Sequence, residues 1–488
     1  VDDARSMPGV VAVHTAADLG LDDRPPAMGF YAAEAIRPFL ARDRVRFVGE
    51  PLAVVVAETA YQAADAAESV WADIEPLTAV VSIHDAVAAE TVLFEARDDN
   101  VMWQIPSAGA IDFSGCEVVV TEKLWNSRVA AVSIEPRVVA ASFADGKLTY
   151  WASSQGTHDF RDGAAKCLGM DPADVRVLVK DVGGGFGAKG MVSEEEVIVG
   201  QLARLIGRPV RWVESRTENL SAYVHGRAQA QTVTIGGTRD GRVTHYRLDV
   251  VQDCGAYPKW GAFLPEFTRQ LASGVYDIAN LEFSAVSVAT NTAPTCAYRG
   301  AGRPEATAAI ERAMDLFAAE VGMDVADVRR VNLLASEAFP YTTPTGTSMD
   351  SGDYEGSLDR ALAAVDYAGL RAEQKRRREA GDHVQMGIGV ATYVEITGFG
   401  GSEYGEVRLR SDGTVLASTG ATPIGTGHHT TWAMIVADRS SGARRNSRSQ
   451  TDAPSIRLRA YSSNLRYAIP TSPSGASNIG TPSRWSRK

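Results

Sequence analysis

Five glycines fall within residues 183–190 of this chain, in the run DVGGGFGAKG that starts at Asp181. Each glycine costs conformational entropy on folding, so such a cluster indicates that the backbone approaches another group closely or adopts positive φ. Before the cluster, valines alternate with other residues over 175–179, as in a strand with one buried face. After it, Ser193 and Glu196 form a capping-box pattern that predicts the start of a helix. The glycines therefore connect a strand to a helix.

The run GFGAKG, residues 185–190, also satisfies the G-x-G-x-x-G pattern of dinucleotide-binding folds. Such a fold places an acidic residue about twenty residues further on. Glu214 is the candidate for that position, and nothing else in the sequence indicates a nicotinamide site. Glycines that serve only a sharp, closely packed turn are the other interpretation that stays open.

Two more glycine-bearing loops precede predicted helices. In AYRGAGRPEA, Arg299 and Arg303 flank a turn of small residues at a helix start, an arrangement suited to an oxyanion or a phosphate. In IGTGHHTTW, the residues 425–427 precede another helix, whose two adjacent histidines make a poor metal pair. Three such loops together predict one extended anionic cofactor, held mainly by backbone amides.

The chain also contains a weak internal repeat. ADGKLTYWASSQGTH at 144–158 and SDGTVLASTGATPIGTGHH at 411–429 both run from an Asp-Gly turn through a strand to a Gly-Thr element. We expect two related halves with a ligand site between them. The spacing also predicts a long helix over 303–322, with an apolar stripe that includes Ile310, and one further helix over 357–381.

Composition excludes several classes of protein. The net charge of −11 argues against a nucleic-acid binder. The four cysteines are scattered without a Cys-x-x-Cys pair, which argues against an iron–sulfur cluster, a zinc ribbon or a disulfide scaffold in this chain. No apolar run reaches the length of a membrane span, and the start shows no secretory leader. We therefore expect a cytoplasmic protein.

Five motifs in order resemble the molybdenum-binding large subunit of the xanthine dehydrogenase and aerobic carbon monoxide dehydrogenase family. They are GEPLAVVVAE, NSRVAAVSIEPR, GGGFGAKG, AYRGAGRPEA and GTGHHTTWAMIVAD. The resemblance covers the chain up to about Asp438 and implies an α+β fold, truncated at both ends. It implies an α/β-hammerhead domain at 1–92, a first molybdopterin-binding domain at 110–340 and an incomplete second one at 341–438.

The resemblance also implies roles for individual residues. The glutamine of the S-x-Q strand end, here Gln155, contacts the molybdenum oxo group. Phe186 lies beside the metal, and the arginine of the Y-R-G turn, here Arg299, flanks the active site. The third loop wraps the pterin or its nucleotide tail. The expected catalytic residues are Phe186 and Arg299, no protein side chain ligates the metal, and the cofactor-binding residues are Gln155, Gly185, Phe186, Gly187, Arg299, Gly425, Thr426 and Gly427.

By the same resemblance, the activity is the oxidative hydroxylation of a small substrate, with water as the source of oxygen. The cofactor is a molybdenum molybdopterin, expected as the cytosine dinucleotide. Iron–sulfur clusters and FAD are expected on separate small and medium subunits, in a dimer of heterotrimers. No nucleic acid is expected as a partner.

Several positions depart from the family pattern. Copper-containing carbon monoxide dehydrogenases carry a cysteine where this chain has Gly300, and purine oxidisers carry an arginine near the position of Phe267. An aldehyde or an N-heterocycle is therefore the expected substrate, with carbon monoxide less favoured. Residues 439–488 are rich in serine and arginine and contain no glutamate, whereas relatives continue to a general-base glutamate. We expect this tail to be a disordered frameshift product; an inactive fragment and a nicotinamide-dependent dehydrogenase are the alternatives.

Overall fold

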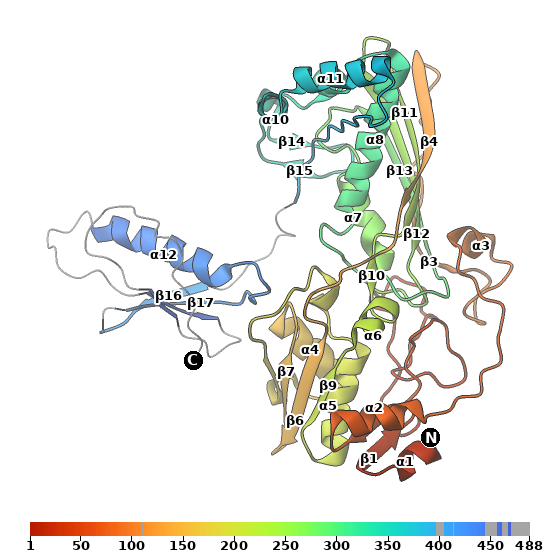
Figure 1. The fold of residues 1–488 in the computed structure, drawn as a ribbon, viewed down its shortest axis with the longest axis vertical. Helices are drawn as coiled ribbons and strands as arrows, with labels where there is room; N and C mark the ends of the chain where they lie inside the picture. The colour runs from red at the N-terminus through yellow and green to blue at the C-terminus, as the bar shows by residue number, and fades with distance from the viewer. Residues whose placement is uncertain (110, 397–404, 413, 445–455, 461–466, 470–488) are drawn as a thin grey trace. The chain divides into compact units, whose positions relative to one another are not determined.

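The computed structural model describes residues 1–109, 111–396, 405–412, 414–444, 456–460 and 467–469 (Figure 1). The chain divides into two compact units that are interleaved along the sequence. The first unit comprises Val1–Val132, Phe186–Ala188 and Glu214–Phe399, and the second comprises Ser133–Gly185, Lys189–Val213 and Gly400–Lys488. Because the units alternate along the chain, the domain boundaries given above stay a prediction.

The first unit is built on a five-stranded sheet whose order is β3-β13-β12-β11-β4. Strands β11 and β12 pair antiparallel, and β12 and β13 pair parallel. One face of this sheet carries buried side chains such as Val233 and Leu248, which pack in one core with helix α8. Figure 1 shows α8 running beside the sheet. The strands are β3 (Val101–Ile105), β4 (Val118–Asn126), β11 (Gln229–Gly237), β12 (Val243–Asp253) and β13 (Asn280–Val288).

Helix α8 (Arg303–Val321) confirms the predicted long helix. Pro304 occupies its first turn, where the missing N–H costs nothing, and Gly322 ends it with φ of 73°. The predicted stripe faces the core, because Ile310, Met314 and Phe317 are fully buried.

Smaller elements complete the first unit. Helices α10 (Tyr354–Ala364) and α11 (Tyr367–Ala380) replace the single helix predicted over 357–381, because Asp366 adopts left-handed φ of 49° and caps α11. The remaining helices are α1 (Asp2–Ser6), α2 (Ala60–Glu68), α3 (Ile83–Ala88), α6 (Arg216–Ser221), α7 (Leu264–Gln270) and α9 (Val325–Asn332). The remaining strands are β1 (Val10–His14), β2 (Val54–Ala57), β5 (Val129–Ala130), β10 (His225–Gly226), β14 (Tyr341–Thr342) and β15 (Ser348–Met349).

The structure of the second unit confirms the internal repeat. Strands β6 (Val138–Ala144) and β7 (Lys147–Ala152) form a hairpin, helix α4 (Thr157–Leu168) follows, and β8 (Val175–Leu178) returns parallel to β7. The second copy repeats this order of elements. Its members are β16 (Gly405–Leu409), β17 (Val415–Thr419), α12 (His428–Arg444) and β18 (Ile456–Ala460), with β18 parallel to β17 and with β19 (Tyr467–Ile469) added at the edge.

The nicotinamide alternative does not agree with this topology. In a dinucleotide fold, the two parallel strands joined by the helix after the glycine segment lie side by side in the sheet. Here α5 (Glu194–Ile206) leads from β8 to β9 (Val210–Val213), and β9 pairs antiparallel with β6, at the end of the sheet opposite β8. Glu214, the proposed ribose ligand, is buried and accepts a hydrogen bond from the Asn219 side chain. β9 runs in the same direction as β8 but lies two strands away from it, with β7 and β6 between them. This alternative therefore has no support, because the place of β9 in the sheet depends on long-range pairing that the local glycine pattern does not encode.

The tail prediction concerns residues 439–488, of which 445–455, 461–466 and 470–488 lie outside the described residues. Of the rest, α12 runs to Arg444 and two segments form β18 and β19. Within the described parts of the chain, no helix is both long enough and apolar enough to cross a membrane.

Candidate functional site

The glycine segment belongs to both units. Residues 183–185 and 189–190 are part of the second unit, and residues 186–188 are part of the first. The candidate site residues therefore fall into two groups, and each is described within its own unit. Gln155, Gly185 and the third loop are in the second unit, whereas Phe186, Gly187 and Arg299 are in the first.

In the second unit, the chain's own side chains pack against the glycines. A Cβ on Gly183 would lie 2.5 Å from Cβ of Glu135, and a Cβ on Gly185 would lie 2.5 Å from the side-chain carboxamide of Gln155. Real Cβ atoms do not approach other heavy atoms so closely. The close-packing interpretation therefore explains why these two positions are glycine.

Gln155 follows the end of β7 and precedes α4 by two residues. Its backbone N–H donates to the carbonyl oxygen of Lys189 at 3.0 Å, and its side-chain Oε1 accepts from the backbone N–H of Lys189 at 3.2 Å. The second of these bonds fixes which end of the amide is oxygen, so the Gln155 side chain has one defined orientation.

A polar cluster packs against the glycine segment, with Ser153 and Lys189 buried and Glu135 partly exposed. Glu135 Oε2 accepts from the backbone N–H of Gly183 at 2.7 Å and from the Ser153 hydroxyl at 2.9 Å. Lys189, only 3% exposed, donates from Nζ to Ser153 Oγ and to the Glu135 carbonyl oxygen, both at 2.7 Å. Its Nζ also lies 3.5 Å from Glu135 Oε2. No local sequence pattern marks Glu135 or Ser153 as part of the site.

In the first unit, the structure brings Phe186 and Arg299 together. The Phe186 carbonyl oxygen accepts from the Arg299 N–H at 2.9 Å. Phe186 is 39% exposed and has left-handed φ of 54°, an uncommon state for a bulky residue. Gly187 has φ of 98°, and a Cβ there would lie 2.7 Å from the carbonyl oxygen of Ala297. Only glycine fits at 187.

The turn that carries Arg299 has three consecutive residues with positive φ, of which Ala301 is strained because it carries a Cβ. Gly300, Ala301 and Gly302 have consecutive φ values of 94°, 46° and 86°. Strained backbone persists only where the surroundings hold it. Arg227 does so here, because its guanidinium donates to the carbonyl oxygen of Tyr298 at 3.0 Å and to that of Arg299 at 2.7 Å.

Arg227 also lies over the Tyr298 ring and pairs with Glu305 at 3.3 Å. Burial raises the pKa of Glu305, although the charge of Arg227 opposes this shift. Sequence reasoning missed Arg227, and no local pattern in HGRAQ distinguishes it from a surface arginine.

The prediction that Arg299 and Arg303 converge on one oxyanion was wrong for Arg303. Its Nε donates to the Gly300 carbonyl oxygen at 2.7 Å and lies 2.7 Å from Glu395. Arg303 is buried and lies over the Phe267 ring, whereas Arg299 is exposed. Arg303 therefore stabilises the turn from inside.

The third loop differs from the glycine segment in its surroundings. Gly425 and Gly427 have φ of 93° and 73°, and a Cβ on either would meet no atom within 4 Å. Helix α12 begins directly after them, at His428. The backbone N–H of Val182 donates to the carbonyl oxygen of Pro423 at 3.2 Å, so the third loop and the glycine segment are neighbours within the second unit.

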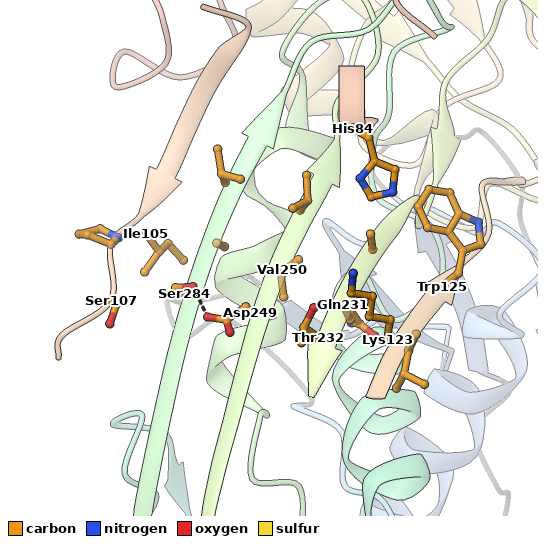
Figure 2. Close-up of a pocket in the computed structure, with 16 residues that line it drawn as sticks. His84, Ile105, Ser107, Lys123, Trp125, Gln231, Thr232, Asp249, Val250 and Ser284 are labelled. Atoms are coloured by element: carbon orange, nitrogen blue, oxygen red, sulfur yellow. Dashed lines mark hydrogen bonds between the residues drawn. The ribbon is translucent and has the colours of Figure 1, made fainter. Parts of the chain in front are cut away.

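A separate pocket of about 520 Å³ lies on the five-stranded sheet of the first unit (Figure 2). Lys123, Trp125 and Thr232 line it, together with Asp249, which accepts from the Ser284 hydroxyl at 2.6 Å. Asp249 also pairs with Arg247. None of the candidate site residues lines this pocket.

Comparisons with known proteins agree with this architecture. Residues 1–78 match the a/b hammerhead domain of aldehyde oxidase and xanthine dehydrogenase, and residues 93–333 and 360–445 match molybdopterin cofactor-binding domains. The chain is 34% identical to the carbon monoxide dehydrogenase large chain of Hydrogenophaga pseudoflava, over 89% of this chain and 58% of that one. It is 33% identical to the nicotine 6-hydroxylase large subunit of Paenarthrobacter nicotinovorans, over 89% and 56%.

Among solved structures, quinoline 2-oxidoreductase from Pseudomonas putida 86 matches with a TM-score of 0.86 and 29% identity, over 96% of this chain and 61% of that one. These matches define a family of molybdopterin-binding oxidoreductases. The chain belongs to the xanthine dehydrogenase and carbon monoxide dehydrogenase family of molybdenum hydroxylases, as the motifs predicted. It spans somewhat less than three fifths of the length of these curated relatives.

The third loop fits an anionic pterin cofactor. Thr422 is only 5% exposed, and its Oγ1 has no hydrogen-bond partner among the described residues. Nδ1 of His428, at the start of α12, is likewise buried without a partner in the described part of the chain. A buried polar atom without a partner is costly and calls for an explanation. Together with the amides at the start of α12 and the open space around Gly425, these atoms are suited to a polar ligand.

Proposed function

We propose that this chain binds a molybdenum molybdopterin and is the catalytic subunit of an oxidoreductase that hydroxylates an N-heterocycle or an aldehyde, with oxygen from water. The observation that supports this most directly is the third loop, where two buried polar atoms, Thr422 Oγ1 and His428 Nδ1, have no partner among the described residues near the start of α12. Family membership makes the cofactor the natural ligand of that loop.

When bound, the cofactor supplies a redox centre that accepts two electrons from the substrate. The chain's own residues hold and orient it. Gly425, Thr426 and Gly427 present backbone amides at the positive end of α12, which stabilises the anionic part of the ligand. Gln155 contributes a side-chain amide of fixed orientation. A Cβ at position 185 would overlap the Gln155 side chain, so glycine at this position leaves room for the Gln155 amide.

Phe186 and Arg299 are also proposed as residues that serve the cofactor. Phe186 and Gly187 would lie beside the metal. The exposed guanidinium of Arg299, whose backbone is held by Arg227 and Phe186, would orient a polar group of the substrate.

Two positions, Gly300 and Phe267, restrict the class of substrate that we propose. Gly300 stands where copper-containing carbon monoxide dehydrogenases have cysteine, and a Cβ there would lie 2.3 Å from Cγ of Pro304. Its φ of 94° adds strain for any other residue. Phe267, near the position of the purine oxidisers' arginine, is buried and stacks on Trp260. Relatives named for nicotine and quinoline support an N-heterocycle.

The cofactor is proposed as the cytosine dinucleotide form. Electrons are proposed to leave through an iron–sulfur subunit and an FAD subunit, in a dimer of heterotrimers. The four cysteines of this chain are far apart in sequence and form no Cys-x-x-Cys pair, which favours clusters on a partner subunit. Relatives described as a large chain or a large subunit are consistent with such a complex.

The test is to produce the chain in a host that makes molybdopterin, and to measure molybdenum and released pterin nucleotide per chain. We expect stoichiometric metal and pterin, and oxidation of N-heterocycles or aldehydes with an artificial electron acceptor. A folded chain that carries neither metal nor pterin would refute the proposal. Cofactor without turnover is the result that the inactive-fragment alternative predicts.

A further inference from the structure

The polar cluster behind the glycine segment connects three separate stretches of the second unit. Glu135 precedes β6, Ser153 follows β7, and Lys189 ends the glycine segment. Each of the three side chains contacts the other two, with distances between 2.7 and 3.5 Å. An ammonium group that is almost fully buried is tolerated only where such oxygens surround it.

Lys189 also holds Gln155 through its backbone. Its carbonyl oxygen accepts from the Gln155 N–H, and its N–H donates to Gln155 Oε1. The side chain of Lys189 therefore fixes a peptide group that in turn fixes the Gln155 amide. Glu135 fixes the other end of the segment, because it accepts from the N–H of Gly183.

We propose that Glu135, Ser153 and Lys189 form a clamp that positions the glycine segment and orients the Gln155 amide toward the cofactor. These are positioning residues, since none of them is assigned a contact with the reacting atoms. The inference rests on the proposed function only in naming the cofactor as what Gln155 faces. The clamp itself is a property of the chain without any ligand.

The structure offers matched variants. Lys189→Met removes the buried charge, whereas Lys180→Met makes the same change at an exposed lysine just before the glycine segment. Glu135→Ala removes the acceptor for Gly183, whereas Glu135→Gln keeps an acceptor oxygen and removes only the charge. Circular dichroism of each variant reports whether the fold is retained.

Two measurements on the full chain test the clamp. The first is amide hydrogen exchange over residues 181–190 in the cofactor-free protein. Lys189→Met and Glu135→Ala are expected to accelerate exchange there about 10-fold or more, Glu135→Gln less, and Lys180→Met not at all. Exchange unchanged by Lys189→Met in this segment would overturn the clamp, whatever the cofactor turns out to be.

The second measurement is molybdenum and pterin retained per chain after dialysis. Loss of an outer-shell partner typically weakens cofactor or metal binding by about 10- to 100-fold. We expect Lys189→Met to show such a loss and Lys180→Met to retain the cofactor. Faster exchange with full retention would overturn the link from the clamp to the cofactor. A wild-type chain that never binds cofactor would instead refute the proposed function. The hydrogen-exchange measurement would still test the clamp in that case.

Discussion

The glycine segment and the third loop look alike in sequence but differ in what surrounds their glycines. At Gly183, Gly185 and Gly187 the space for a Cβ is filled by the chain itself. At Gly425 and Gly427 that space is empty, and both residues have positive φ. A glycine-rich loop can therefore serve close packing in one place and access for a ligand in another, within a single chain.

The helices that follow the two loops show the same difference. The first turn of α5, after the glycine segment, contains Glu194, Glu195 and Glu196, whose carboxylates compensate the positive end of the helix. The first turn of α12, after the third loop, contains no acidic residue. The start of α12 therefore remains available to an anionic ligand. The open glycines agree with this, as do the two buried polar atoms that have no partner among the described residues.

The largest expected effect comes from filling the crowded loop. Gly187→Ala should destabilise the chain by about 2–4 kcal/mol, because the Cβ meets the Ala297 carbonyl oxygen and the residue must keep positive φ. Gly190→Ala is the matched control, since a Cβ there meets nothing within 4 Å. Urea unfolding of the cofactor-free proteins measures both. Equal stability of the two variants would contradict the packing account.

Filling the open loop should cost less in the absence of cofactor. Gly425→Ala is expected to lose roughly 1–2 kcal/mol, which is the cost of left-handed backbone for a residue with a Cβ. Gly146→Ala, in the β6–β7 turn, has a similar φ of 76° and equally open surroundings. The two variants should match in urea unfolding, but only Gly425→Ala should lose molybdenum and pterin. If both retain the cofactor equally, the third loop is not its site.

Much of this comparison was beyond the reach of the sequence. The strand-to-helix position of both loops, the Ser193 capping box and the repeated halves all follow from local patterns, and the structure confirms them. What fills the space beside a glycine depends on residues far away in the chain. Glu135 reaches Gly183 across 48 positions, and no local pattern encodes that approach.

The same reason explains the residues that were missed or misread. Arg227 reaches the Arg299 carbonyl oxygen across 72 positions. The sequence around Arg303 suggests an anion ligand, but its guanidinium pairs with the distant Glu395. The break between α10 and α11 is a different case, since Asp366 adopts left-handed backbone at a site where the alanine-rich pattern predicts a continuous helix. The periodicity of apolar residues predicts which face of a helix is buried better than it predicts a break at a single residue.

Thr422, in the third loop, is a position where we expect a substitution not to lower the stability of the cofactor-free chain. Thr422→Val should leave the cofactor-free chain unchanged or stabilise it by about 1 kcal/mol, because it removes a buried hydroxyl that has no partner among the described residues. The same change should weaken cofactor retention if the hydroxyl binds the ligand. Thermal unfolding with and without cofactor measures both effects. Clear destabilisation of the cofactor-free chain would show that Thr422 has a structural role instead.

The smallest effect concerns the carboxylates that distinguish α5 from α12. Burial raises the pKa of Glu196, although Arg137 and the Ser193 N–H oppose the shift. A raised native pKa means that the neutral acid is favoured in the folded state. Its stabilising contribution is complete below the ordinary carboxyl pKa, and it is lost as the pH rises through the raised value.

Glu196→Gln should therefore flatten the pH dependence of stability in that window, by less than about 1.4 kcal/mol per pH unit, the limit for one proton. Glu218 makes the same capping bond to Ser215 at the start of α6, but it is exposed. Glu218→Gln is thus the matched control for loss of the capping bond itself, measured by urea unfolding at a single pH. An identical slope for wild type and Glu196→Gln would mean that the buried carboxylate stays charged in the folded chain. The start of α5 would then hold a full negative charge, and its contrast with the start of α12 would be sharper than proposed here.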